Sequence, residues 1–308
     1  MTNPVVTVLV PIYNGSAYLA ETIRSLLSQT FMDFELLAID DGSTDASAEI
    51  VRSFKDERIR LIQKKNGGLC ETLNLGIAKA KAPYIARCDQ DDISYPERLE
   101  RQLQVMREHP DALGLFAYST KFGNRRSWSN ADKMIMAKGE VKDYQPMEDG
   151  CVLCSTMLAQ TAALQSIGGF RQAYYPADDW DMECRLAEAG RVLILREPLI
   201  AYRFQTSANT YRVFAEMQKK ARWTKDSYQR RLQSTPELTF EQFLRSQPNG
   251  IFLRLRRYRK DSAKLHMRTA GQRYLDGQYV AAAVHLLAAV VFQPENLAGR
   301  TRRYFTRS

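Results

Sequence analysis

The sequence is poor in histidine and lacks the glycine-rich loops that mark common nucleotide-binding proteins. It has 3 histidines among 308 residues, and none of them belongs to an H-E-x-x-H pattern. Neither G-x-G-x-x-G nor G-x-x-x-x-G-K-[ST] occurs, which removes the main support for a dinucleotide-binding or P-loop protein. Any catalytic chemistry is therefore expected to depend on carboxylates.

Cysteine is also scarce, and long apolar runs are absent. The odd number of cysteines and the lack of a secretory signal predict a reducing, cytoplasmic environment. Cys151 and Cys154 form a lone C-x-x-C without a second pair or a nearby histidine, which favours packed thiols over a zinc site. The longest apolar candidate, residues 280–292, is shorter than the roughly 20 residues needed to span a bilayer.

Positive charge is concentrated at the C-terminus. The whole chain carries +9, from 44 Lys+Arg against 35 Asp+Glu. Residues 251–308 hold 12 of the basic and 3 of the acidic residues, so the remaining chain is balanced at 32 of each. The length favours two domains. We expect a catalytic domain over residues 1–205 and a basic, helical region over residues 206–308.

Strands and helices are predicted to alternate through the first hundred residues. Apolar runs predict strands near residues 5–10, 34–39, 58–62 and 84–88, and segments with helical spacing separate them. This alternation with short connections predicts an α/β fold with a mostly parallel sheet flanked by helices. In such open sheets, ligands bind at the carboxyl ends of the strands.

Acidic residues follow two of the predicted strands. Asp40 and Asp41 end the second strand, and Asp89, Asp91 and Asp92 follow the fourth. Because both turns come after parallel strands, we expect them at the same edge of the sheet. Close carboxylates repel one another unless positive charge lies among them. Oxygen ligands at such an edge suit Mg²⁺ or Mn²⁺ shared with substrate phosphates.

The turn after residues 84–88 is predicted to run directly into a helix. Ser94 and Glu97 match a capping box, and Pro96 stands in the first turn. A solvated acidic turn that caps this helix is the alternative to a metal site, because charged runs commonly form solvated faces.

A third acidic group and a long polar segment lie further along the chain. Asp178, Asp179 and Asp181 stand at a predicted helix start, where acids complement the helix dipole. One of them could instead act as a general base. Residues 121–150 are polar and long for a connection, which predicts a lid that closes over a ligand.

Five ordered motifs resemble those of the family 2 inverting glycosyltransferases with the GT-A fold. The resemblance covers roughly residues 4–205, with residues 1–110 as the nucleotide-binding half and residues 111–205 as the acceptor half. The motifs are residues 8–14 (V-L-V-P-I-Y-N), 40–45 (D-D-G-S-T-D), 66–68 (N-G-G) with Asn74 and Gly76, 86–92 (A-R-C-D-Q-D-D) with 96–99 (P-E-R-L), and 167–170 (I-G-G-F) with 178–181 (D-D-W-D) and Arg185.

The resemblance implies roles for particular residues. Asp91 would bind the divalent cation, Mn²⁺ or Mg²⁺, that bridges the donor diphosphate. Asp179 would be the general base that deprotonates the acceptor hydroxyl. The family usually has Glu before this Asp, and Asp178 stands there instead, so both carboxylates remain candidates. The nucleotide pocket would be lined by Pro11, Tyr13, Asp40, Asn66, Gly68 and Asp89.

The implied activity is inverting transfer of a sugar from a nucleotide-diphosphate donor, expected to be a UDP-sugar. The acceptor would be a hydroxyl of a glycan or lipid-linked molecule in cell-surface polysaccharide biosynthesis. Gln205 replaces a histidine that is common in the family, so any metal or phosphate role of that histidine is lost. The rival hypotheses are a sugar nucleotidyltransferase and a non-catalytic module that binds sugar nucleotides.

The basic C-terminal helices have two interpretations. Basic residues lie among aromatic and aliphatic ones at residues 251–260 and 300–307, which predicts docking on the anionic inner face of the cell membrane. The alternative is a helical hairpin that packs on the catalytic domain or on a second subunit of a homo-oligomer. Binding of nucleic acid is not expected.

Overall fold

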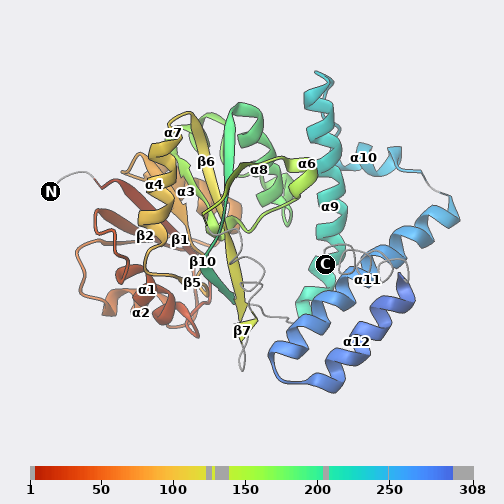
Figure 1. Cartoon of the computed structure of the whole chain (residues 1–308), viewed down its shortest axis with the longest axis horizontal. Helices are drawn as coiled ribbons and strands as arrows, with labels where there is room; N and C mark the ends of the chain where they lie inside the picture. The colour runs from red at the N-terminus through yellow and green to blue at the C-terminus, as the bar shows by residue number, and fades with distance from the viewer. Residues whose placement is uncertain (1–3, 123–126, 129–138, 204–207, 249, 294–308) are drawn as a thin grey trace. The chain divides into compact units, whose positions relative to one another are not determined.

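The structure is a computed structural model that describes residues 4–122, 127–128, 139–203, 208–248 and 250–293. The chain divides into two compact units. The sheet unit comprises Met1–Lys121 and Ser129–Arg203, and the helical unit comprises Phe122–Trp128 and Phe204–Ser308 (Figure 1).

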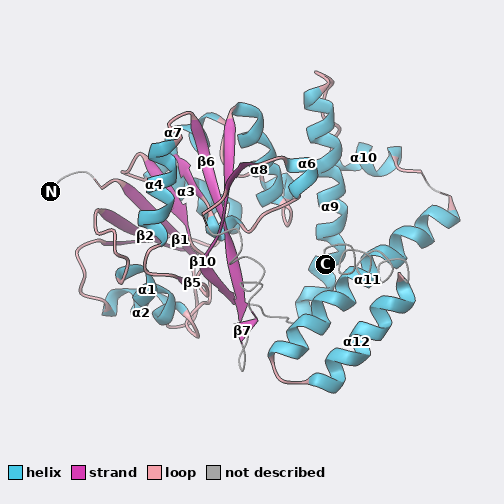
Figure 2. Cartoon of the chain, in the orientation of Figure 1, coloured by secondary structure: helices cyan, strands magenta, loops and turns pink. Residues whose placement is uncertain are grey.

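The sheet unit is built on a mixed sheet with the strand order β3-β2-β1-β4-β9-β6-β10-β5 (Figure 2). The four N-terminal strands run parallel, whereas β9 pairs antiparallel with β4 and β6, and β10 with β5 and β8. The predicted α/β fold is therefore confirmed. The strands are β1 (Val6–Ile12), β2 (Phe34–Asp40), β3 (Ile59–Gln63), β4 (Tyr84–Arg87), β5 (Ile93–Ser94), β6 (Ala112–Phe122), β7 (Ser127–Trp128), β8 (Val141–Asp143), β9 (Leu158–Gln160) and β10 (Arg191–Arg203).

Helices cover both faces of this sheet. Since consecutive residues of a strand point to opposite sides, one strand contributes to the apolar core on each face. Val8 and Val10 of β1 belong to the apolar core beneath α1 and α4, whereas Leu9 belongs to the core beneath α3, α7 and α8. A Cβ atom at Gly76 would lie 2.3 Å from a methyl group of Leu9, so glycine lets α3 approach β1 closely. The helices of this unit are α1 (Leu19–Leu27), α2 (Ser47–Ser53), α3 (Leu69–Lys79), α4 (Arg98–Glu108), α6 (Pro146–Asp149), α7 (Thr161–Ser166) and α8 (Asp178–Ala189).

Parallel pairing brings the two predicted acidic turns to the same edge of the sheet. Asp40 is the last residue of β2 and pairs with Ile12 of β1. Arg87 is the last residue of β4 and pairs with Leu9 of β1. The turn of residues 89–92 follows at once, so the two acidic turns lie at the carboxyl ends of β2 and β4, the strands on either side of β1, and share one edge of the sheet as expected.

One detail of the predicted secondary structure is wrong. Ser94 and Glu97 do not form a capping box: α4 begins at Arg98, and its cap residue makes no side-chain hydrogen bond. Ser94 is part of β5 instead, and its hydroxyl accepts a hydrogen bond from Nη1 of Arg98 at 3.0 Å.

The predicted lid at residues 121–150 is tested only in part. Residues 123–126 and 129–138 lie outside the described residues. The described end of the segment forms β8 and the short helix α6. Closure over a ligand therefore stays a prediction.

The helical unit contains α9 (Ala208–Leu232), α10 (Phe240–Ser246), α11 (Ile251–Leu275) and α12 (Tyr279–Phe292). Trp223 of α9 donates its indole N–H to the carbonyl of Leu238 at 2.8 Å and packs on Phe240 of α10. Gly277 turns the chain between α11 and α12 with a φ of 75°. Across the described residues, we find no helix that combines the length and apolarity required to cross a membrane.

Candidate active site

A cavity of about 430 Å³ opens at the carboxyl edge of β1, β2 and β4. Its walls come from the end of β1, the turns after β2 and β4, the start of α3, and the aromatic residue Tyr175. Six of the predicted site residues line it, namely Pro11, Tyr13, Asn66, Gly68, Asp89 and Asp91, together with Ile12, Asp41, Leu69, Thr72, Arg87 and Gln90.

Gln90 fixes the end of β1 to the acidic turn. Its side-chain oxygen accepts from the N–H of Tyr13 at 2.9 Å, and its side-chain nitrogen donates to the carbonyl of Tyr13 at 3.1 Å. The side chain of Tyr13 nevertheless stays 49% exposed. The cavity therefore has an aromatic ring at its mouth whose backbone cannot move independently of the acidic turn.

The structure places Asp41, rather than the predicted Asp40, at the cavity wall. Asp40 is buried, and its two oxygens accept from the N–H of Ser43 at 2.9 Å and from the amide of Gln63 at 3.0 Å. The two carboxylates therefore have different roles. Asp40 stabilises the turn after β2, whereas Asp41 lines the cavity.

Asp41 organises the loop that precedes α3. Its oxygens accept from the N–H groups of Gly67 at 2.8 Å and Gly68 at 2.9 Å, and Lys64 donates to it at 2.6 Å. These bonds hold the pKa of Asp41 below its usual value although burial opposes them. Gly68, with a φ of 89°, begins α3 at the cavity wall, so the positive end of the helix dipole is available to an anion there.

Asp92 is the structural member of the acidic turn after β4. It is fully buried and accepts from the hydroxyl of Ser155 at 2.7 Å and from the N–H of Arg203 at 3.0 Å. The guanidinium of Arg203 donates to the carbonyl of Asp91 at 3.0 Å. Arg203 thereby ties this turn to the end of β10. Gln205, which stands where the family commonly has a histidine, lies outside the described residues.

Asp91 presents the least satisfied carboxylate of this turn. Burial, and then the charge of Asp89, raise the pKa of Asp91 to about 6. Among the described residues, none of the Lys or Arg side chains forms an ion pair with it. A cation placed at Asp91 would offset both effects by favouring the charged carboxylate.

Arg87 joins the second and third acidic groups, and sequence reasoning missed it. It is 3% exposed, and its Nε lies 3.0 Å from Asp89 while its Nη1 lies 2.6 Å from Asp179. Both carboxylates raise the pKa of Arg87, although burial alone would lower it. The signal was an arginine inside an otherwise apolar strand, because a buried guanidinium requires carboxylate or carbonyl partners.

The predicted acidic group at the start of α8 separates into three roles. Asp178 is 3% exposed; burial and the neighbouring Asp179 raise its pKa, and its Oδ2 has no hydrogen-bond partner among the described residues. Asp179 keeps 33% of its side chain exposed beside Arg87. Asp181 is fully buried and pairs with Arg171 and Arg185.

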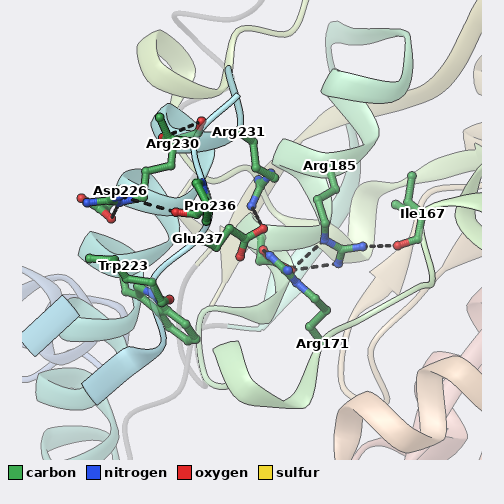
Figure 3. A network of polar contacts seen from close by, with 12 residues as sticks. Ile167, Arg171, Arg185, Trp223, Asp226, Arg230, Arg231, Pro236 and Glu237 are labelled. Atoms are coloured by element: carbon green, nitrogen blue, oxygen red, sulfur yellow. Dashed lines mark hydrogen bonds and ion pairs between the residues drawn. The ribbon is translucent and has the colours of Figure 1, made fainter. Parts of the chain in front are cut away.

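Asp181 has a structural role, because it anchors the loop before α8. Arg185 binds Asp181 and donates to the carbonyl of Gly169. It also donates to the carbonyl of Ile167, as Figure 3 shows. Asn74 of α3 exchanges two hydrogen bonds with the backbone of Phe170, at 2.8 and 2.7 Å. The loop of residues 167–170 is thus fixed from both sides, which positions α8 and its exposed Asp179.

The donor set fits a divalent cation that is shared with a substrate. Among the described residues, no group of three His, Cys, Asp or Glu side chains is placed to hold a metal ion by itself. Magnesium sites commonly use one or two carboxylates, with substrate phosphates and water as the remaining ligands. Asp91, at the cavity wall, meets that requirement.

Comparison with known proteins agrees with this architecture. The family model described as Glycosyl transferase family 2 matches residues 7–165. EpsE of Bacillus subtilis (strain 168) is 34% identical over 227 residues, which cover 69% of this chain and 78% of that protein. An uncharacterized glycosyltransferase of Rickettsia felis is 26% identical over 215 residues, 68% of this chain but 36% of its own length. The chain therefore matches only about a third of that relative.

A solved structure is similar in fold over nearly the whole chain. Staphylococcus aureus TarS 1–349 in complex with UDP-GlcNAc superposes with a TM-score of 0.59, at 17% identity, and covers 96% of this chain and 92% of that one. The family match and the shared architecture lead to one conclusion: the chain belongs to glycosyl transferase family 2 and has the GT-A fold.

Proposed function

We propose that the protein is a metal-dependent, inverting glycosyltransferase that uses a nucleotide-diphosphate sugar, with UDP-sugars as the preferred class. The observation that carries this proposal is that Arg87, which lines the cavity together with Asp91, also binds Asp179. Asp91 and Arg87 line the cavity, and Asp179 contacts Arg87 at 2.6 Å. The guanidinium of Arg87 thus connects the proposed diphosphate site with the exposed carboxylate of Asp179.

The nucleotide would enter between Tyr13 and the loop before α3. The exposed ring of Tyr13 offers a face for a base, and an aromatic face contributes about 1–3 kcal/mol to the binding of each stacked base. Asn66 and Gly68 line the same wall, where the start of α3 favours anions. TarS in complex with UDP and UDP-GlcNAc, which shares the fold, supports a uridine nucleotide as the first class to test.

The cation, Mn²⁺ or Mg²⁺, would be held by Asp91 together with the donor diphosphate. When bound, it would stabilise the negative charge of the departing nucleotide diphosphate. Asp89 would contribute through Arg87, which holds one of its oxygens at 3.0 Å and so fixes the carboxylate beside the donor.

Asp179 is the better candidate for the general base. Its side chain is 33% exposed, whereas Asp178 is 3% exposed and cannot reach an acceptor in solution without rearrangement. A base must come within hydrogen-bond reach of the proton that it removes. We therefore assign proton removal from the acceptor hydroxyl to Asp179, with Asp178 as the second candidate.

The acceptor is proposed to be a hydroxyl of a glycan or of a lipid-linked sugar in cell-surface polysaccharide biosynthesis. In this scheme residues 1–110 bind the donor, and residues 111–205 bind the acceptor. A sugar nucleotidyltransferase is less well supported, because the turn after β1, Asn14-Gly15-Ser16, is not a basic glycine-rich loop.

A panel of nucleotide sugars with and without Mn²⁺ tests the proposal. Thermal shift reports donor binding, and release of the nucleoside diphosphate reports turnover. We expect one UDP-sugar to stabilise the protein in the presence of the metal and to be hydrolysed slowly without acceptor. Binding without any nucleotide release, with every donor and with added glycan acceptors, would instead identify a non-catalytic module.

A further inference from the structure

The last two helices pack on each other through small residues. Ala263 and Ala270 of α11 and Ala282 and Ala289 of α12 are all buried. Each pair is seven residues apart, so its members share one face of their helix. Rings also meet in this contact, since Phe292 of α12 packs on Tyr258 and His266 of α11, and His285 packs on His266. The contact thus uses alanines and rings, and it leaves much of the aliphatic surface of α12 uncovered.

The large aliphatic residues of α12 form an exposed row, which we call the α12 stripe: Val280, Val284, Leu287 and Val291. Their exposed fractions are 82%, 60%, 66% and 76%. The outward face of a helix on a globular protein is normally polar, yet α12 contains no Asp, Glu, Lys or Arg. A continuous exposed apolar surface of this kind marks an interaction site.

The surface beside the α12 stripe is strongly basic. In α11, 8 Lys+Arg stand against one acid, Asp261, which is already paired with Arg222 at 3.0 Å. Arg259 donates to the carbonyl of Phe292 at 3.0 Å, so the basic first half of α11 adjoins the last turn of α12. Phe252 and Leu255, 83% and 53% exposed, are interleaved with these basic residues.

Charge and length together select the partner. A second copy of the chain would bring like charges together, which is unfavourable, whereas anionic lipid headgroups complement the basic residues. The 14 residues of α12 span about 21 Å at 1.5 Å per residue, less than the roughly 30 Å of a bilayer's hydrocarbon core. The helix can therefore lie in the membrane interface but cannot cross it.

We propose that the α12 stripe and the basic first half of α11 form a docking surface for an anionic lipid bilayer. The stripe would enter the boundary between headgroups and acyl chains, and Arg256 and Lys260 would contact the headgroups. Basic residues next to aliphatic and aromatic ones are typical of helices that lie in a membrane interface. The inference concerns the helical unit alone and stands whether or not the proposed transferase activity is correct.

Flotation of the full chain with vesicles of known composition tests this surface. The probe is phosphatidylcholine vesicles containing about one third phosphatidylglycerol, compared with pure phosphatidylcholine vesicles at low salt. Val284→Ser/Leu287→Ser should weaken binding to the anionic vesicles by at least about tenfold, since two aliphatic side chains lose their burial. Arg256→Gln/Lys260→Gln should weaken it about 25-fold, or about fivefold for each charge.

Matched controls separate the surface from general effects on the fold. Leu232→Ser removes an aliphatic residue of α9 that is 61% exposed, and Arg245→Gln removes an exposed charge of α10. Both should bind anionic vesicles as the unmodified chain does, and all variants should keep its circular dichroism spectrum.

Three results would overturn the proposal. The first is no binding of the full chain to anionic vesicles at low salt. The second is a failure of either comparison: the full chain binds neutral vesicles as well as anionic ones, or either double variant binds anionic vesicles as well as the unmodified chain does. The third is a dimer in sedimentation velocity that Val284→Ser/Leu287→Ser dissociates while no vesicle binding occurs, which would identify a second copy as the partner.

Discussion

Replacing Arg87 by methionine tests whether one guanidinium holds the carboxylates of Asp89 and Asp179 together. Methionine keeps an unbranched stem but removes every hydrogen-bond donor of the side chain. Removing one partner of a buried ion pair costs about 3–5 kcal/mol. Asp89 and Asp179 keep 28% and 33% of their side chains in water. We therefore expect the lower end, a loss of about 3 kcal/mol in the free energy of unfolding.

A double-mutant cycle with Asp179→Asn isolates the contact itself. A hydrogen bond between charged groups contributes about 1.5–3 kcal/mol, so we expect a coupling energy near 2 kcal/mol between Arg87→Met and Asp179→Asn. Urea unfolding can be followed by the fluorescence of Trp180, which lies in α8 of the sheet unit. The other two tryptophans, Trp128 and Trp223, would be replaced by phenylalanine to remove their signals.

Activity and a control variant complete this test. Arg87→Lys keeps the charge but offers a compact ammonium instead of a fork, so it should fold yet lose at least about tenfold in turnover. Arg58→Met removes a comparable ion pair, with Asp56 at 2.8 Å, away from the cavity, and should lower stability without lowering turnover. A coupling energy below about 0.5 kcal/mol, or full turnover by Arg87→Met, would refute the bridging role.

The remaining predictions concern the metal, the base and the helical unit. Asp91→Asn should fold normally, lose the thermal stabilisation given by donor plus Mn²⁺ and abolish nucleotide release; full activity in excess chelator would contradict the metal assignment. Asp179→Asn should keep donor binding and lose transfer by at least about a hundredfold, measured as product formation; a larger loss in Asp178→Asn would reverse the assignment of the pair. Burial, and then the charge of His285, lower the pKa of His266. Below about pH 6.5 the unfolded chain therefore takes up a proton more readily than the folded one, and stability of α11 and α12 should fall as the pH drops further. Hydrogen exchange of these helices at neutral and acidic pH measures this loss, and His266→Gln should flatten it.

The architecture of the N-terminal part of the sheet was predictable because its signals are local. The apolar runs that become β1 to β4 and the short connections between them lie within residues 5–88 and require no distant partner. Parallel pairing then places both acidic turns at one edge without further information. Gly68, with its positive φ at the start of α3, follows the same logic, since a tight entry into a helix favours glycine.

The charges that complete the site could not be predicted, because they come from far along the chain. Arg203 reaches Asp91 and Asp92 from more than a hundred residues away, through the return of β10 beside β5. Arg87 reaches Asp179 across 92 residues. The choice between Asp40 and Asp41 was equally hidden, because it depends on which of two adjacent side chains turns toward Gln63 and which toward the loop before α3.

These distant contacts change how the acidic turn after β4 must be understood. Three carboxylates within four residues require compensating charge or hydrogen bonds. Arg87 binds Asp89, and Ser155 with the backbone of Arg203 binds Asp92, so the protein itself satisfies two of the three. Burial and the charge of Asp89 raise the pKa of both Asp91 and Asp92, to about 6 and about 8, but of these two only Asp91 lines the cavity. Because Asp91 lines the cavity and forms no ion pair with a Lys or Arg of the described residues, a cation bound there would offset its burial and the charge of Asp89. In the proposed mechanism, a diphosphate bound in the cavity would share that ion.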